Sequence, residues 1–185
     1  KSKPTQKLAD TPTHFHVETF PEGSYIVVPK TSSERRKYIP MGFLDASVMC
    51  SDALHVIPSG TLYHFGILES LIHMAWTRVV AGRLRSDYRY SSGLVYNNFV
   101  WPSVSGSVRE GIERTAQGIL DARGLCPDSS LAELYDDVSM PVELRRAHRE
   151  NDEAVREAYG FGGGLCELEI VGRLMEMYNA VSERG

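Results

Sequence analysis

The sequence has little cysteine, no long apolar run and no large excess of either charge. Its 185 residues include three cysteines, too few and too scattered for a disulfide framework or a paired-cysteine metal knuckle. No apolar stretch approaches the roughly 18 residues that a membrane-spanning helix needs, and the lysine-rich start does not lead into a signal-peptide core. The sequence therefore predicts a protein of a reducing cytoplasm with no membrane partner.

The composition is that of an ordinary globular protein, with 42% hydrophobic and 24% charged residues. The net charge of −4 conceals a difference between the two halves. Residues 1–102 carry 11 Lys and Arg against 8 Asp and Glu, a balance of +3, whereas residues 103–185 carry 9 against 16, a balance of −7. This asymmetry predicts one basic working surface and one acidic flank.

The first half reads as short extended segments between turns, interrupted by one buried helix. The helix is predicted over residues 62–84, where apolar residues recur at helical spacing. Residues 1–12 are polar and read as a linker or an arm added for expression. The predicted strands are Thr13–Phe20, Tyr25–Val28, Tyr38–Ile39 with Met41–Leu44, Ala53–Ile57 and Leu94–Trp101.

The second half changes to a helical period. Amphipathic helices are predicted over Val108–Leu120, Leu144–Tyr159 and Leu168–Val181, with Ser103 as a cap and Gly160–Gly164 as an interhelical turn. The predicted fold class is therefore α+β. A β-rich module with a buried helix occupies residues 13–102, and an α-helical domain occupies residues 103–185.

Catalytic and metal-binding patterns are weak. His14 and His16 share one side of a predicted strand but have no third metal ligand nearby, and His73 reads as a core histidine. The glycines at 160–164 follow a helix instead of a strand, which does not suit a phosphate or adenosyl cradle. Asn97–Val100 lacks both prolines of the Asn-Pro-Pro-aromatic motif of amino methyltransferases. We therefore predict no catalytic residue, cofactor or metal in this chain.

Two basic segments are more informative. Lys30–Tyr38 and Arg83–Ser92 together hold seven of the eleven basic residues of the first half, interspersed with Ser, Thr and Tyr. Such side chains contact phosphate oxygens, and arginine can also grip guanine through two parallel hydrogen bonds. A solvated loop that keeps its charges for solubility has the same composition. The pattern thus permits DNA binding without requiring it.

Several longer strings resemble one known family. They resemble the carboxy-terminal part of MmeI-type DNA methyltransferases, the single-chain type IIL restriction-modification enzymes and their stand-alone methylase relatives. The resemblance runs from about Tyr25 to Tyr178, with its motifs in the family's order. The strings are Pro29–Leu44, Leu62–Leu68, Ser86–Ser91, Tyr96–Phe99, Leu120–Arg123, Pro127–Asp136 and Met140–Pro141.

The resemblance implies a target recognition domain followed by a helical C-terminal domain. In this family the full enzyme transfers a methyl group from S-adenosylmethionine to the exocyclic amine of adenine, and some members add a nuclease. The resemblance places those catalytic parts upstream, in a methyltransferase domain of the same polypeptide outside this chain. It also implies double-stranded DNA as the partner and the bacterial cytoplasm as the location.

Under this interpretation, the two basic segments lie on one side of the molecule, along the major groove of a duplex. The acidic helices pack against the recognition module or the absent core, since their charge repels phosphates. A protein-interaction scaffold without DNA contact and a self-contained enzyme remain as alternatives. The candidate DNA-binding residues are Lys30, Ser32, Ser33, Glu34, Arg35, Arg36, Lys37, Asp52, His55, Arg83, Arg85, Tyr88, Arg89, Tyr90 and Ser91.

Overall fold

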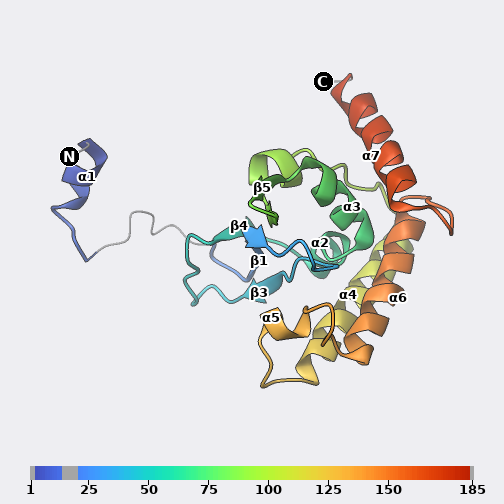
Figure 1. The fold of residues 1–185 in the computed structure, drawn as a ribbon, viewed down its shortest axis with the longest axis horizontal. Helices are drawn as coiled ribbons and strands as arrows, with labels where there is room; N and C mark the ends of the chain where they lie inside the picture. Colours follow the sequence, from blue (N-terminus) through green and yellow to red (C-terminus); the bar gives the residue numbers. More distant parts are fainter. Residues whose placement is uncertain (1–2, 14–20, 184–185) are drawn as a thin grey trace.

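The computed structural model describes residues 3–13 and 21–183, which form two small antiparallel sheets packed against helices (Figure 1). The first sheet has the strand order β3 (Gly42–Leu44), β1 (Tyr25–Pro29), β4 (Leu54–Pro58), and the second has the order β2 (Thr31–Ser32), β6 (Asp87–Arg89), β5 (Gly82–Leu84). The helices are α1 (Lys3–Leu8), α2 (Leu62–Leu68), α3 (Leu71–Val80), α4 (Gly106–Gly124), α5 (Leu131–Leu134), α6 (Val142–Ala158) and α7 (Glu167–Ser182), with a π-helical turn η1 (Ser92–Tyr96). The predicted α+β class is confirmed.

β1 is the middle strand of the first sheet, and its apolar run Tyr25–Val28 is buried. Ile26 lies opposite Phe43 of β3 on one side and Ile57 of β4 on the other. An unbroken apolar run is what a strand covered on both faces requires. The chain returns past Ile26 at Gly60, where a Cβ atom would lie 2.6 Å from Ile26 Cδ1, so this close approach requires glycine.

The single helix predicted over residues 62–84 is wrong, because the structure has two helices and a strand there. α2 ends at Leu68 and α3 begins at Leu71. Ser70 stands at the N-cap of α3 in an extended conformation, and its Oγ accepts a hydrogen bond from the backbone N–H of His73 (3.3 Å). Both helices bury apolar residues, so the periodicity continues across the break and conceals it.

Two predicted strands are also wrong. Tyr38 and Ile39 lie in the buried loop between β2 and β3, where side chains from other elements replace a strand partner. The segment Leu94–Trp101 begins inside η1, and the Val95 carbonyl accepts a hydrogen bond from Trp76 Nε1 (3.0 Å). The strands predicted near Tyr25 and Ala53 are confirmed, and so is the Met41–Leu44 part of the strand predicted after Tyr38, which forms β3. The strand predicted over residues 13–20 falls largely on residues 14–20, outside the described residues.

The three helices predicted for the second half are confirmed as α4, α6 and α7. The N-cap of α4 lies two residues later than predicted, because Ser105 and not Ser103 holds that position. The predicted turn between α6 and α7 is confirmed, and two of its glycines adopt the left-handed backbone, Gly160 with φ 65° and Gly164 with φ 92°. Side chains strain in that conformation, which explains glycine there.

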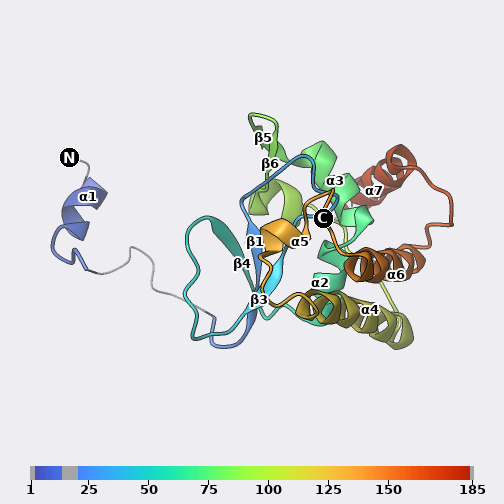
Figure 2. The same cartoon turned by 60° about the horizontal axis from the view of Figure 1, so that its bottom comes forward.

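The short helix α5 is absent from the sequence-based interpretation. It begins with a reciprocal cap, in which the backbone N–H of Glu133 donates to Ser130 Oγ (3.3 Å) and Glu133 Oε2 accepts from the backbone N–H of Ser130 (2.7 Å). A Cβ atom built on Gly42 would lie 4.0 Å from the Leu131 side chain, so α5 covers β3. Figure 1 and Figure 2 show α5 beside β3 from two directions.

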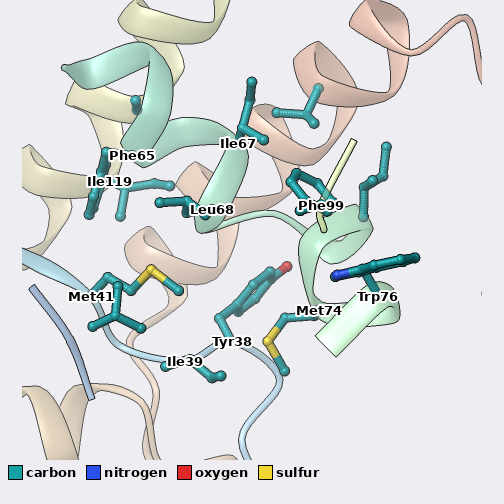
Figure 3. Packing of buried hydrophobic residues seen from close by; sticks show 14 of the residues in the cluster. Tyr38, Ile39, Met41, Phe65, Ile67, Leu68, Met74, Trp76, Phe99 and Ile119 are labelled. Atoms are coloured by element: carbon teal, nitrogen blue, oxygen red, sulfur yellow. The ribbon is translucent and has the colours of Figure 1, made fainter. Parts of the chain in front are cut away.

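The two halves share one buried core. α4 and α6 run side by side (Figure 1), and α2 packs closely against α4. A Cβ atom on Gly66 of α2 would lie 2.7 Å from Ile112 Cγ2 of α4, and the Gly66 carbonyl accepts a hydrogen bond from Asn151 Nδ2 of α6 (2.7 Å). Figure 3 shows Tyr38 inside this cluster, with Met41 and Met74 on either side. The sheets give way to helices near residue 103, but one hydrophobic core includes residues from both sides of that position.

Candidate nucleic-acid interface

The second sheet joins the two basic segments. β2 belongs to the first segment and β6 to the second, and they pair with Thr31 opposite Arg89 and Ser32 opposite Tyr88. The pairing continues beyond the strands, because the backbone N–H of Tyr90 donates to the Lys30 carbonyl (2.9 Å). The two segments are thus direct neighbours in one sheet, as the predicted DNA surface requires.

Lys30 connects this sheet to the first one. Its backbone N–H donates to the carbonyl of Ala53, just before β4 (2.9 Å), while its carbonyl accepts from Tyr90 on the other side. His55 of β4 lies behind the junction, where its Nε2 is 3.2 Å from the Tyr90 carbonyl oxygen. Asp52 lies in the exposed turn before β4. His55 is half-buried and holds the junction together, whereas Asp52 faces solvent beside it.

The register of the second sheet exposes arginines on both of its faces. Thr31 and Arg89 lie opposite each other and are exposed, and Gly82 on the far side of Arg89 leaves that face free of a third side chain. On the opposite face, the Arg83 guanidinium stacks over the Tyr88 ring at 4.1 Å from the ring centroid. Arg83 Nη1 also donates to the Ser86 carbonyl (3.1 Å), so its exposed guanidinium is held in one orientation.

Arg85 occupies the turn between β5 and β6 in the left-handed backbone region, with φ 59°. Glycine or asparagine is usual at such a position, and another residue there costs roughly 1–2 kcal/mol. Its side chain is exposed at the tip of the hairpin. A strained arginine at an exposed tip is more readily explained by what its charge contacts than by the stability of the turn.

The first basic segment forms a tight turn after β2. The backbone N–H of Arg36 donates to the Ser33 carbonyl (3.2 Å), and the backbone N–H of Arg35 donates to Ser33 Oγ (3.3 Å). Glu34 and Arg35 therefore lie at an exposed tip, while Arg36 is half-buried and its Nη1 donates to Ser32 Oγ (3.3 Å). Lys37 follows, exposed, with its Nζ 5.4 Å from the Tyr38 ring centroid.

Four predicted contact residues have their side chains engaged inside the protein, which corrects their assignment. Ser32, Tyr88 and Tyr90 are 2%, 4% and 2% exposed, so they have no surface to offer to a partner. The Tyr90 hydroxyl lies 3.1 Å from His73 Nε2, and burial raises the pKa of Tyr90. Ser91 is half-buried, and its Oγ caps η1 by accepting from the backbone N–H of Leu94 (3.3 Å). These residues support the surface from below.

A buried ion pair, which no pattern in the sequence indicated, binds the backbone of Met41. Arg123 Nη2 of α4 donates to Glu69 Oε1 (2.8 Å), with side chains 9% and 0% exposed. Glu69 Oε1 also accepts from the Met41 N–H (2.6 Å), and Arg123 Nη1 donates to the Met41 carbonyl (2.6 Å). The backbone N–H of Met41 is thus bound by Glu69 of the first half, and its carbonyl by Arg123 of the second half.

Tyr135 and His148 complete this buried network. The Tyr135 hydroxyl accepts hydrogen bonds from Arg123 and lies 2.7 Å from His148 Nε2. His148 Nδ1 lies 3.2 Å from the Glu69 carbonyl oxygen, so we assign the proton to Nδ1 and let Tyr135 donate to Nε2. Burial lowers the pKa of His148 to about 3, which agrees with a neutral ring. Burial raises the pKa of Glu69 to about 6, opposed chiefly by Arg123, so Glu69 is charged at neutral pH.

Tyr38 attaches the loop between β2 and β3 to α6. Its hydroxyl donates to Asp152 Oδ2 of α6 (2.7 Å), and its ring stacks on His148 with centroids 3.9 Å apart. The other oxygen of Asp152 accepts from the backbone N–H of Leu71 at the start of α3 (2.7 Å). Burial raises the pKa of Asp152 to about 6. The acidic half therefore braces the module, as predicted, through contacts at both Tyr38 and Met41.

The Asn97–Val100 segment makes contacts within the protein. Asn98 Nδ2 donates to the Gly93 carbonyl (3.2 Å), and Phe99 is buried against His73 and Trp76. In the part of the chain that the structure describes, no three His, Cys, Asp or Glu side chains gather as a metal site, and His14 and His16 lie outside that part. None of the helices in residues 3–13 and 21–183 is both long and apolar enough to cross a bilayer.

Comparison with known proteins gives consistent matches over the whole chain. Residues 1–103 match the family model of the MmeI target recognition domain, and residues 104–184 match that of the MmeI C-terminal domain. The chain is 43% identical over 183 residues to DNA methyltransferase A of Bacillus subtilis (strain 168), a match that covers 98% of this chain and 21% of that protein.

A solved structure shares the fold. It is that of the type IIL restriction-modification enzyme MmeI in complex with DNA, and it matches with a TM-score of 0.94 and 43% identity. The match covers 99% of this chain and 24% of the MmeI chain. The chain therefore spans less than a quarter of the length of each of these two relatives.

Proposed function

This chain belongs to the MmeI family, as a target recognition domain followed by a C-terminal domain, and from that premise we propose that it reads the base sequence of duplex DNA. The relative of known structure was solved in complex with DNA, which supports the proposal. The surface that serves this function is the second sheet with the turn that follows β2. We call it the basic face, although it takes in exposed residues on both sides of the small second sheet. Its exposed or half-buried members are Lys30, Thr31, Ser33, Glu34, Arg35, Arg36, Lys37, Arg83, Arg85 and Arg89.

The observation that carries the proposal is the pairing of β2 with β6. It sets Thr31 beside Arg89 and brings two arginine-rich segments into one surface, although they are distant in sequence. Arg83 is held by stacking and a carbonyl contact, and Arg85 keeps a strained backbone at an exposed tip. Preorganised arginines lose less freedom when they bind a phosphate or a base edge.

The chemistry of the basic face divides its roles. The tip residues Glu34 and Arg35 can reach base edges in the major groove, where a carboxylate accepts from cytosine and an arginine donates to guanine. The arginines of the β5–β6 hairpin form no ion pair in the described residues, although Asp87 lies in the same hairpin, and this suits contacts to phosphate oxygens. Phosphate contacts fix the register, and the tip then selects the sequence.

We assign methyl transfer to a longer protein that contains this chain. In that protein, S-adenosylmethionine supplies the methyl group for the exocyclic amine of adenine, and the relative named as a DNA methyltransferase supports the assignment. The glycines at 160–164 lie between two helices and do not fit the cofactor, so we place its binding site in polypeptide outside this chain. The chain itself binds and orients the DNA, within the bacterial cytoplasm.

A titration with duplex DNA at several salt concentrations tests the proposal. Each phosphate that the basic face neutralises should add about 0.9 to the slope of log affinity against log salt concentration. Arg89→Gln should weaken binding, because the Arg89 side chain is exposed beside Thr31 and its removal disturbs no internal contact. Arg114→Gln on the exposed side of α4 is the matched control and should bind like the parent.

The alternative, a scaffold without DNA contact, predicts a different result. It predicts no binding to duplex DNA at low salt, and equal behaviour of Arg89→Gln and Arg114→Gln. Either outcome would refute DNA reading by this face. Tight stoichiometric binding of S-adenosylmethionine to the chain would instead refute the assignment of the cofactor to other polypeptide.

A further inference from the structure

We propose that Lys37 of the recognition module and Arg145 and Arg149 of α6 form one phosphate-binding pocket, which takes a phosphodiester group of the DNA backbone. The proposal rests on the DNA-reading function proposed above, and it extends the DNA contact to the C-terminal domain. The three cations line a cavity of about 170 Å³ together with Tyr38, Tyr135, Asp137 and Met140. We call this cavity the joint pocket, because its lining comes from both halves.

Arg145 is fixed in place without being neutralised. Its Nε donates to the Met140 carbonyl (3.0 Å), and its Nη2 donates to the carbonyls of Asp137 (3.0 Å) and Val138 (3.3 Å). Carbonyl oxygens orient a guanidinium but leave its full positive charge in place. The remaining donor, Nη1, is held ready for an oxyanion, which reduces the freedom lost when the oxyanion binds.

Arg149 lies four residues after Arg145, so the two like charges stand on the same side of α6. This spacing is unfavourable for an isolated helix unless an anion lies between the charges. The contrast with Arg146 is informative, because Arg146 pairs with Glu150 at 3.9 Å on the exposed surface. Arg146 thus has a carboxylate partner four residues on, whereas Arg145 has the cation Arg149 at that spacing. Arg149 is followed four residues on by the exposed Glu153, with which no ion pair within 4.0 Å is formed in the described residues.

Lys37 adds its charge from the opposite side. It is exposed and its Nζ lies 5.4 Å from the Tyr38 ring centroid, while its positive charge helps to lower the pKa of Asp152 below what burial alone would give. The hydroxyl groups of Tyr38 and Tyr135 are engaged with Asp152 and His148, so they form the floor of the pocket and not its donors.

The charge balance of the joint pocket favours an anion. Asp137 is the one carboxylate in the lining, which gives the three cations and one anion a net formal charge of +2. The cavity has room for a phosphate group with some water, and Lys37 belongs to the same turn as the exposed tip of the basic face. A phosphodiester is therefore the occupant that continues the DNA surface from β2 onto α6.

The test is a double-variant cycle measured by DNA titration between about 50 and 200 mM salt. Arg149→Gln removes no internal hydrogen bond, so its fold should be intact, and Lys37→Gln is the partner change. If both cations hold one phosphate, the double variant should lose about 0.9 of the salt slope in total, equally for unrelated duplex sequences. Arg146→Gln, on the same helix, should keep the slope of the parent.

Several outcomes would overturn the pocket. An unchanged slope in the double variant would do so, and so would a loss of about 1.8 in the double variant, because that result means two independent phosphates. If the parent chain binds no duplex at low salt, the DNA-reading function fails, and titration with inorganic phosphate decides the pocket separately. A saturable shift of the Arg145 Nε nuclear magnetic resonance signal, lost in Arg149→Gln, would then assign the pocket to free phosphate. No shift would refute it.

Discussion

The buried pair of Glu69 and Arg123 should dominate the stability of the joint between the two halves. Arg123→Met keeps most of the side-chain volume but leaves the Glu69 carboxylate, which is 0% exposed, without a counter-charge. It also leaves the Met41 carbonyl and the Tyr135 hydroxyl without the donor that now reaches them. We expect this single change to destabilise the whole protein, since both halves share one core.

The magnitude follows from burial. Removing one partner of a buried ion pair costs roughly 3–5 kcal/mol, and for a chain of this size each 1 kcal/mol lowers Tm by roughly 2–4 °C. A loss of roughly 10 °C is therefore expected. The double variant Glu69→Met/Arg123→Met should recover much of this loss, because no unpaired charge remains. It should still be less stable than the parent, since the Met41 N–H and C=O each lose a partner.

Urea unfolding, followed through the fluorescence of Trp76 and Trp101, of which Trp76 is buried, provides the assay. Arg146→Met is the matched control, because that arginine is 69% exposed and its pair with Glu150 should be worth less than about 1 kcal/mol. The reasoning fails if Arg123→Met loses no more stability than Arg146→Met. It also fails if the double variant is less stable than the single one.

Two further predictions concern the hairpin and the buried titratable groups. Arg85→Gly should stabilise the protein by about 1 kcal/mol in urea unfolding, because glycine adopts the φ of 59° without strain. The same change should weaken DNA binding. An unchanged DNA affinity would show that the strained backbone of Arg85 does not serve DNA contact. Burial lowers the pKa of His73 and His148 to about 3, so their stabilising contribution is present above pH 6.5 and is lost as pH falls toward 3. Burial raises the pKa of Glu69 and Asp152 to about 6, so their contribution acts in the opposite direction between pH 6 and about 4.5. The free energy of unfolding should therefore change little across that interval and fall below it, by roughly 3 kcal/mol per pH unit at most for two histidines; a steep loss already between pH 6 and 5 would contradict these assignments.

Hydrophobic periodicity predicted the elements that bury one clear stripe or run. The helices α4, α6 and α7 were predicted from residues repeating at helical spacing, and β1 from its continuous apolar run. The segments that contain β2 and β6 stand out in the sequence only by their content of basic residues. The alternation of charged and aromatic residues from Asp87 to Tyr90 also indicates a strand with one buried face, although the strands predicted from the sequence do not include this segment. Tyr88 and Tyr90 were for that reason assigned to the surface.

The buried ion pair of Glu69 and Arg123 could not be predicted, because both residues look like solvent-exposed residues in the sequence. Arg123 lies in the last turn of a helix, where a cation is ordinarily favourable, and Glu69 lies between two helices. They meet across 54 positions, and only the packing of α2 on α4 brings them together. The strand predicted at Tyr38 failed for a related reason, since its hydrogen-bond partner is Asp152 in the other half.

The central claim is that the second sheet makes one DNA-reading surface from two distant segments. The most direct measurement follows the backbone amide resonances of the chain by nuclear magnetic resonance while duplex DNA is added. We predict that the amides of residues 30–37 and 82–89 shift together and saturate at the same DNA concentration, while those of α7 stay in place. Shifts confined to one of the two segments, or centred on the acidic helices, would contradict the claim.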